Sequence, residues 1–187
     1  MPLDIILIGP IGAGKTTVGE RLAAQLNCPQ HSVDDLRWGY YQEIGYDEAV
    51  AQQKRESGGL WALGQYWKPF EAYAVERLLS EHHHCVIDFG AGHSVYEDEA
   101  LFQRVARVLA PYPNVVLLLP SADIDECIQI LSERNKEEPA DCMKVNEQFI
   151  RHPSNSRLAK FTVYTKGETP AETCQKISEL VEREESL

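Results

Sequence analysis

The glycine-rich segment at residues 9–16 constrains the fold of this chain more than any other feature. It reads Gly-Pro-Ile-Gly-Ala-Gly-Lys-Thr and fits the phosphate-binding pattern G-x-x-x-x-G-K-[ST]. The apolar run Ile5–Ile8 precedes it, and a helical pattern with Val18, Leu22 and Leu26 on one face follows it. Because strand, loop and helix stand in this order, the loop N–H groups and the positive end of the helix dipole are expected to surround phosphate oxygens. The segment predicts a binding site for ATP or GTP.

The loop residues divide into backbone and side-chain roles. The glycines let the backbone curl inward, Lys15 is expected to reach the β and γ phosphates, and the Thr16 hydroxyl is expected to bind Mg²⁺. The nucleotide-binding residues predicted from the pattern are Gly9, Gly12, Ala13, Gly14, Lys15 and Thr16.

Length and charge limit the class of protein. The 187 residues suffice for one α/β domain, and 18 Lys and Arg against 29 Asp and Glu give a net charge of −11. This charge disfavours binding to nucleic acid or to an anionic membrane surface, so the expected partner is a small molecule. Five scattered cysteines indicate reduced thiols, and neither a signal segment nor a long apolar stretch is found. We expect a cytoplasmic protein, either a monomer or a homodimer.

Short apolar runs alternate with helical patterns along the chain. Residues 5–8, 85–89, 115–119 and 161–165 predict buried parallel strands, and residues 32–33 are a weaker candidate for a fifth strand. Capping patterns predict helix starts at Ser94, Asp123 and Thr169, and residues 57–59 predict a loop. The alternation predicts an α/β fold, a three-layer α/β/α sandwich around a five-stranded parallel sheet.

Two further motifs discriminate among phosphate-loop proteins. Residues 135–138 read Asn-Lys-Glu-Glu, which comes close to the guanine-binding pattern N-K-x-D but follows a helical pattern and ends in Glu. Asp88 ends an apolar run without the second acid that ATP-hydrolysing motors carry, and we expect it to help hold the metal. The sequence therefore favours phosphoryl transfer to a small acceptor over hydrolysis.

These motifs together resemble the shikimate kinase family. The resemblance rests on the phosphate loop with Thr17, acids at 34 and 35, the segment Ile-Asp-Phe-Gly-Ala-Gly at 87–92, and a later segment that contains arginine. It implies a nucleotide role for Thr17, a substrate-binding helical segment at about 34–82 and a mobile lid at about 134–157. It also implies an adenine-binding loop that includes Gly167, Thr169 and Pro170.

The resemblance implies a set of acceptor residues as well. Asp34 or Asp35 is expected to orient the acceptor hydroxyl and help hold hydrated Mg²⁺, and the spacing leaves open which of the two acts. Acids that merely cap the next helix are the alternative. The expected acceptor-binding residues are Asp34, Lys68, Glu71, Gly90, Ala91, Gly92 and Arg157.

Three positions depart from the family pattern. Lys68 stands where the family has an arginine, and lysine cannot make the planar two-point contact with a carboxylate. Ala91 interrupts the family's triple glycine, and residues 134–139 replace its arginine-rich lid. We therefore expect the same chemistry on an acceptor other than shikimate.

Aromatic and basic residues gather in the two segments expected to surround the acceptor. Residues 38–73 hold nine of the sixteen aromatic side chains, which suits either a pocket that stacks a ring or helices that pack on the sheet. In the lid segment Arg134 is the strongest candidate to stabilise the transferring phosphoryl group, and an exposed surface arginine is the alternative.

The sequence thus predicts an enzyme, an ATP- and Mg²⁺-dependent small-molecule kinase. Its expected catalytic residues are Lys15, Asp34, Asp35 and Arg134, and its expected metal-binding residues are Thr16, Asp34 and Asp88. Two other readings stay open: a nucleoside or nucleotide kinase, and a regulatory ATPase whose aromatic segment contacts a protein partner.

Overall fold

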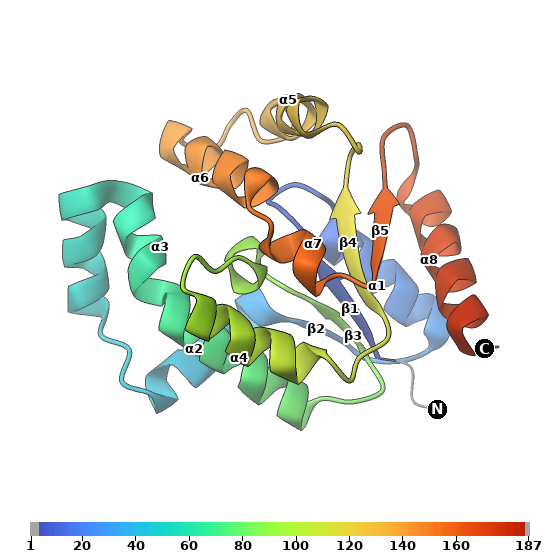
Figure 1. The fold of residues 1–187 in the computed structure, drawn as a ribbon, viewed down its shortest axis with the longest axis horizontal. Coiled ribbons are helices and arrows are strands. Elements are labelled where there is room, and N and C mark those ends of the chain that lie inside the picture. Colours follow the sequence, from blue (N-terminus) through green and yellow to red (C-terminus); the bar gives the residue numbers. More distant parts are fainter. Residues whose placement is uncertain (1–3, 186–187) are drawn as a thin grey trace.

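Five parallel strands form the centre of the molecule. The structure is a computed structural model, and it describes residues 4–185. The strands stand in the order β2-β3-β1-β4-β5 (Figure 1). Their bounds are β1 Ile5–Ile8, β2 Gln30–Ser32, β3 Val86–Asp88, β4 Val115–Leu119 and β5 Phe161–Tyr164. The predicted five-stranded parallel sheet is confirmed, and the weak candidate near residue 32 is a strand that begins two residues earlier.

Helices cover both faces of the sheet. Their bounds are α1 Lys15–Leu26, α2 Val33–Glu43, α3 Glu48–Glu81, α4 Glu99–Leu109, α5 Ile124–Arg134, α6 Ala140–Arg151, α7 Ser154–Leu158 and α8 Pro170–Glu185, with a 3₁₀ turn, η1, at Ala91–Ser94. One apolar cluster joins α1 and α8 to the sheet, and another joins α2, α3, α4 and α7 to its other face. The three predicted layers are confirmed.

The strand order brings the functional elements to one edge of the sheet. β1 lies in the middle, between β3 and β4, with Leu7 paired to Asp88 on one side and Val116 on the other. After β1 the chain forms β2 and β3 on one side of this strand and then crosses to form β4 and β5 on the other side. A parallel sheet binds ligands at such a switch point, beyond the carboxyl ends of its strands. In Figure 1, α5 and α6 lie beyond the carboxyl ends of β4 and β5.

The prediction that a helix starts at Ser94 is wrong. Ser94 is the last residue of η1, and α4 begins at Glu99. Asp98 is the N-cap of α4, and its Oδ1 accepts hydrogen bonds from two backbone N–H groups at 2.8 and 3.1 Å. The Ser94 hydroxyl is buried and donates to Asn155 Oδ1 at 2.7 Å. A tertiary hydrogen bond therefore occupies the side chain that the local pattern assigned to a cap.

The other two predicted helix starts and the predicted loop are confirmed. Asp123 caps α5, and Thr169 and Glu172 form a reciprocal capping box at the start of α8. The loop predicted at residues 57–59 is a break inside α3, where Gly59 has φ 65° and ψ −160°, a conformation that only glycine adopts without strain. The break lets the two halves of α3 take different directions.

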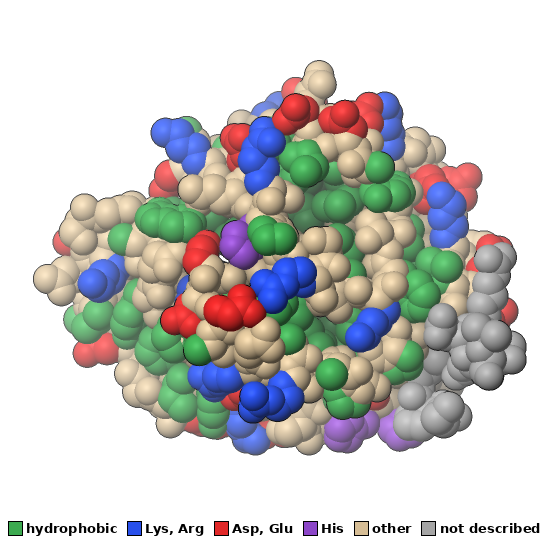
Figure 2. All heavy atoms as spheres, in the orientation of Figure 1, with side chains coloured by type: hydrophobic (Ala, Val, Ile, Leu, Met, Phe, Trp, Pro, Cys, Tyr) green, Lys and Arg blue, Asp and Glu red, His purple; other side chains and the backbone are tan. Residues whose placement is uncertain are grey.

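Two surface properties concern possible partners. Over residues 4–185, no helix has the length and apolar character needed to cross a bilayer. Figure 2 shows acidic and basic side chains interspersed over the face seen in Figure 1. The surplus of acidic residues is therefore not gathered into one patch on this face.

Candidate active site

The phosphate loop follows β1 and ends at Thr16, the second residue of α1. Gly9 has φ 143°, and a Cβ there would lie 2.5 Å from the Leu118 carbonyl oxygen of β4. Gly14 is the N-cap of α1 with φ 93°. Because both conformations require glycine, the pattern's fixed residues are explained by backbone geometry. The loop leads the chain from a buried strand into a helix whose N-terminus is open to an anion.

Lys15 folds back over this loop. Its Nζ donates to the carbonyl oxygens of Gly9 and Pro10, both at 2.9 Å. Burial lowers the pKa of Lys15 to about 8, and the carboxylates of Asp34 and Asp88 oppose this shift. The ammonium group therefore lies within the field of both predicted acids, where it can neutralise phosphate charge.

Asp88 lies at the end of β3 beside the loop. Its Oδ2 accepts from Gln30 Nε2 at 2.7 Å. Burial raises the pKa of Asp88, and hydrogen bonds from Ser32, Gln30 and Thr16 oppose this shift. The structure thus brings together Thr16 and Asp88, the hydroxyl and carboxylate predicted to hold Mg²⁺. Among residues 4–185 no group of three or more His, Cys, Asp and Glu side chains is arranged to hold a metal ion, so the fit rests on this pair together with phosphate oxygens.

The lid segment contacts the phosphate loop directly. Arg134, the last residue of α5, donates from Nη1 to the Gly12 carbonyl oxygen at 3.3 Å. Asn146 of α6 is buried and pairs with Ile11 at two points: its Oδ1 accepts from the Ile11 N–H at 2.7 Å, and its Nδ2 donates to the Ile11 carbonyl at 3.1 Å. Asn135 Nδ2 donates to the same carbonyl at 3.2 Å. Three side chains therefore fix the loop backbone from the lid side.

A pocket of about 240 Å³ opens beside the loop, between α2, α3, η1 and α6. Six of the seven predicted acceptor residues line it: Asp34, Lys68, Glu71, Gly90, Ala91 and Gly92. Apolar and aromatic side chains complete the wall, among them Trp61 and Trp67 of α3 and Phe149 of α6. The volume lies below the range of about 300–1,000 Å³ typical of drug-sized ligands, so it suits a small molecule.

The choice between the two neighbouring acids is clearer in the structure. Asp34 lines the pocket and pairs with Arg37, one turn along α2, with Nη1 and Oδ1 3.0 Å apart. Both acids are exposed, but Asp35 is not among the described residues that line the pocket. Asp34 is therefore the acid that the fold brings to the pocket.

Lys68 and Glu71 form a buried ion pair in the pocket wall. Their Nζ and Oε2 atoms are 2.7 Å apart, and Nζ also donates to the Gly92 carbonyl at 2.9 Å. A Cβ at Gly92 would lie 2.3 Å from Glu71 Oε1, so the glycine makes room for the pair. The Lys68 ammonium also lies over the rings of Tyr96 and Phe149, at 5.4 and 5.3 Å.

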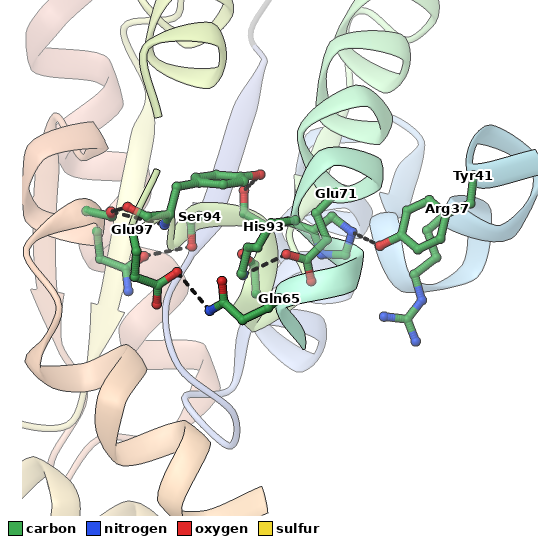
Figure 3. A network of polar contacts seen from close by, with 12 residues as sticks. Arg37, Tyr41, Gln65, Glu71, His93, Ser94 and Glu97 are labelled. Atoms are coloured by element: carbon green, nitrogen blue, oxygen red, sulfur yellow. Dashed lines mark hydrogen bonds and ion pairs between the residues drawn. The ribbon is translucent and has the colours of Figure 1, made fainter. Parts of the chain in front are cut away.

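His93 closes the inner end of the pocket. Its Nε2 lies 3.3 Å from the Tyr41 hydroxyl, and Figure 3 shows the two side chains pointing toward each other. Its Nδ1 has no hydrogen-bond partner within the described part of the chain, although the Gly90 carbonyl lies close enough to raise the pKa somewhat. Burial dominates and lowers the pKa of His93 to about 3, so the ring is neutral at physiological pH.

Two predicted groups lie apart from the pocket. Arg157 on α7 pairs through two nitrogens with Glu99 of α4, at 3.2 and 3.0 Å, and stacks on Phe102 at 3.8 Å. Within residues 4–185 it is not a pocket-lining residue. The loop with Gly167, Thr169 and Pro170 lies between β5 and α8, where the Thr169 side chain caps the helix. Its backbone lies at the carboxyl edge of the sheet that also carries the phosphate loop.

Arg37, Asn135 and Asn146 are site residues that the sequence reasoning missed. Arg37 follows Asp34 by one helical turn, a spacing that could have indicated an ion pair. Asn146 follows Val145 and precedes Phe149 on the inner face of α6, and a buried amide on an apolar face is a signal for a specific partner. The identity of that partner, the Ile11 backbone, depends on the fold.

Comparison with known proteins places the chain among P-loop proteins that include kinases. The model of the AAA domain family matches residues 5–151. A shikimate kinase of Streptomyces avermitilis is 26% identical over 188 residues, with 97% of each chain covered. One from Francisella tularensis subsp. holarctica is 27% identical over 190 residues, covering 98% of this chain and 97% of the relative.

Solved structures show the same fold. A shikimate kinase from Acinetobacter baumannii in complex with shikimate matches with a TM-score of 0.67 and 23% identity, over 97% of this chain and 94% of that chain. A gluconokinase from Sinorhizobium meliloti matches with a TM-score of 0.59 and 18% identity, over 97% and 95% of the two chains.

A phosphate loop, a lid in contact with it and an adjoining small-molecule pocket together define the class of P-loop kinases. The chain belongs to the AAA domain family, because the family model matches most of its length. It is a P-loop enzyme of the shikimate kinase-like type, as the motifs predicted.

Proposed function

We propose that this protein transfers a phosphoryl group from ATP to a hydroxyl of a small metabolite. The observation that carries the proposal is the position of Asp34, which lines the acceptor pocket and also lies close enough to Lys15 for its charge to oppose the lowering of the Lys15 pKa by burial. One carboxylate thus connects the pocket with the phosphate loop. Phosphoryl transfer needs this proximity, since its catalysis consists mainly of positioning and charge neutralisation.

Each part of the site has a role in this proposal. Asp34 accepts a hydrogen bond from the acceptor hydroxyl and aims its oxygen at the phosphoryl group. Lys15 and Arg134 neutralise charge on that group, and Thr16 and Asp88 hold Mg²⁺, which offsets phosphate charge when bound. Residues 34–82 bind the acceptor, and residues 134–157 act as the lid over a single domain that spans the chain. The scattered cysteines support a cytoplasmic location.

The acceptor is proposed to be a molecule other than shikimate. Lys68 stands where the resemblance to the family implies an arginine, and it is already bonded to Glu71 and Gly92. Arg157, the other predicted cation of the acceptor site, is bonded to Glu99. The pocket therefore offers a carboxylate weaker contacts than the family pattern implies.

The proposal is tested by measuring ADP release in the presence of ATP, Mg²⁺ and a panel of acceptors. The panel holds shikimate, sugars, sugar acids, nucleosides and nucleoside monophosphates. We expect one class to raise turnover above background hydrolysis, and Lys15→Ala to lower that turnover by about 10²–10³-fold, as for loss of a group that stabilises transition-state charge. Background-level release with every acceptor contradicts the kinase proposal, and a signal with shikimate contradicts the proposed change of acceptor.

A regulatory ATPase remains the second candidate because of two exposed tryptophans. Trp38 and Trp61 are each 41% exposed, on α2 and α3. Trp61 also lines the acceptor pocket, which favours a ligand-binding role for it. Turnover that depends on a protein partner and on no small acceptor is the result expected of this candidate.

A further inference from the structure

The ionisable side chains of the acceptor pocket cancel one another in charge. Four of the lining residues carry formal charge, and they form two ion pairs. Asp34 and Arg37 are 3.0 Å apart, and Lys68 and Glu71 are 2.7 Å apart. His93 is neutral, since burial holds its pKa at about 3. The described lining residues therefore present no net charge to a ligand.

Both cations also make contacts within the protein. Two of the three Lys68 N–H groups point at Glu71 and at the Gly92 carbonyl, and its side chain is only 7% exposed. The Arg37 guanidinium lies 4.7 Å from the centre of Trp38 and 5.4 Å from that of Trp67. A ligand carboxylate entering the pocket would add an uncompensated negative charge next to Asp34 and Glu71. Such a charge loses its hydration without gaining a free counter-ion.

The remaining features of the pocket favour uncharged groups. Trp61, Trp67 and Phe149 offer flat apolar faces to a ring. Among the uncharged side chains of the lining, His93 has one buried atom, Nδ1, without a hydrogen-bond partner within residues 4–185. A buried polar atom without a partner is costly, so a ligand that supplies one is favoured. A hydroxyl fits His93 Nδ1 in either tautomer, because it donates as well as accepts.

We propose that the acceptor is an uncharged ring alcohol, and that Glu71 excludes carboxylate and phosphate-bearing acceptors by neutralising Lys68. This inference rests on the proposed kinase function and narrows its substrate class. Sugars and nucleosides remain in that class, whereas shikimate, sugar acids and nucleoside monophosphates leave it. Figure 3 shows Glu71 and His93 in the same part of the pocket, one from α3 and the other from η1.

Matched pairs of ligands test the charge rule by calorimetry without nucleotide. The pairs are shikimate with methyl shikimate, glucuronate with glucose, and adenosine monophosphate with adenosine. The proteins are the wild type, Glu71→Gln and Glu76→Gln. The last is a matched control, since Glu76 lies on the same helix, pairs with Arg104 and lies outside the described pocket lining. Both variants raise the net charge by one, but only Glu71→Gln frees Lys68.

We expect Glu71→Gln to improve binding of the charged member of a pair relative to its uncharged partner by about tenfold or more. The reason is that the freed Lys68 ammonium, in a partly buried site, strongly attracts a ligand carboxylate or phosphate. Glu76→Gln should keep the wild-type preference. If the wild type binds none of the six probes, Glu71→Gln should bind the charged members measurably and more tightly than their uncharged partners. A wild type that prefers the charged members overturns the proposal, and so does a Glu71→Gln protein without the gain.

Folding and function are controlled separately. Cooperative urea unfolding checks each variant, and if Glu71→Gln does not fold, Glu71→Met replaces it. Methionine is uncharged and of similar length, so it also removes the carboxylate that neutralises Lys68, and the same gain is expected. Absence of the gain there overturns the proposal. Calorimetry measures binding without turnover, so the charge rule can be tested even if the kinase assay detects no activity. Conversely, kinase activity can be measured even if the binding data contradict the charge rule.

Discussion

At the level of single residues, the protonation state of Lys15 in the phosphate loop affects how the loop binds its ligand. Nearby carbonyl oxygens and the carboxylates of Asp34 and Asp88 favour the ammonium form, yet burial outweighs them. Bound phosphates bring two or more negative charges to this group and must raise its pKa. The protonation of Lys15 is therefore coupled to nucleotide binding.

This coupling predicts how nucleotide affinity depends on pH. The pKa of Lys15 is about 8 in the free protein and higher in the complex, so binding takes up a proton above pH 8. The Kd for ADP should rise as pH increases, by up to about tenfold per unit above pH 8. Calorimetry between pH 7 and 9.5 measures this slope. Lys15→Arg stays charged throughout and should show none, so an equal slope in that variant contradicts the assignment.

At the level of elements, helix α6 contacts both the phosphate loop and the pocket beside it. Val145 and Phe149 line the acceptor pocket, whereas Asn146 between them bonds the Ile11 backbone of the phosphate loop. Ile11 lines the pocket as well. Because α6 contacts both, a shift of this helix would move the phosphate loop and the wall of the pocket together.

Loss of the Asn146 amide should therefore weaken both the fold and the loop. Asn146→Ala leaves the Ile11 N–H without its 2.7 Å partner in a partly buried place, and we expect a loss of about 1–3 kcal/mol in the free energy of unfolding. ADP should also bind more weakly. Urea unfolding and calorimetry measure the two effects. Gln148→Ala on the exposed side of α6 is the control and should change stability by less than about 0.5 kcal/mol. Equal losses in both variants would mean that Asn146 acts only through helix propensity.

Sequence patterns predicted elements well where local and tertiary preferences agree. Asp123 and Thr169 cap their helices as expected because their partners lie three residues away. Ser94 carried the same pattern, yet its hydroxyl bonds Asn155, which lies 61 residues further along the chain. A local pattern contains no information about such a partner.

At the level of the whole molecule, the site is assembled across the sheet. The loop follows β1, Asp88 ends β3, Asp34 follows β2, and the lid follows β4. Each of these four strands is followed by one part of the site, so a nucleotide at the loop would contact several elements at once. Ligand binding should then stabilise the cooperative unfolding unit as a whole.

A thermal shift measures this stabilisation. ADP at a hundred times its Kd should add about 2.7 kcal/mol, or roughly 5–11 °C in Tm for a chain of this size. Differential scanning calorimetry with and without ADP tests it, and Lys15→Ala at the same ADP concentration should show a much smaller shift. A shift that survives in this variant would place the nucleotide elsewhere.

The sequence by itself determined the parallel sheet, the phosphate loop and most of the residues that line the pocket beside it. These features depend on periodicity, on glycine conformation and on residues close together in the chain, all of which are local properties. Only the tertiary structure decided which acid reaches the pocket, that Arg157 is bonded to Glu99, and that Asn146 holds Ile11. It also decided that Lys68 and Arg37 are each neutralised by a carboxylate. These outcomes depend on distances between segments tens of residues apart and on burial, which no local pattern encodes.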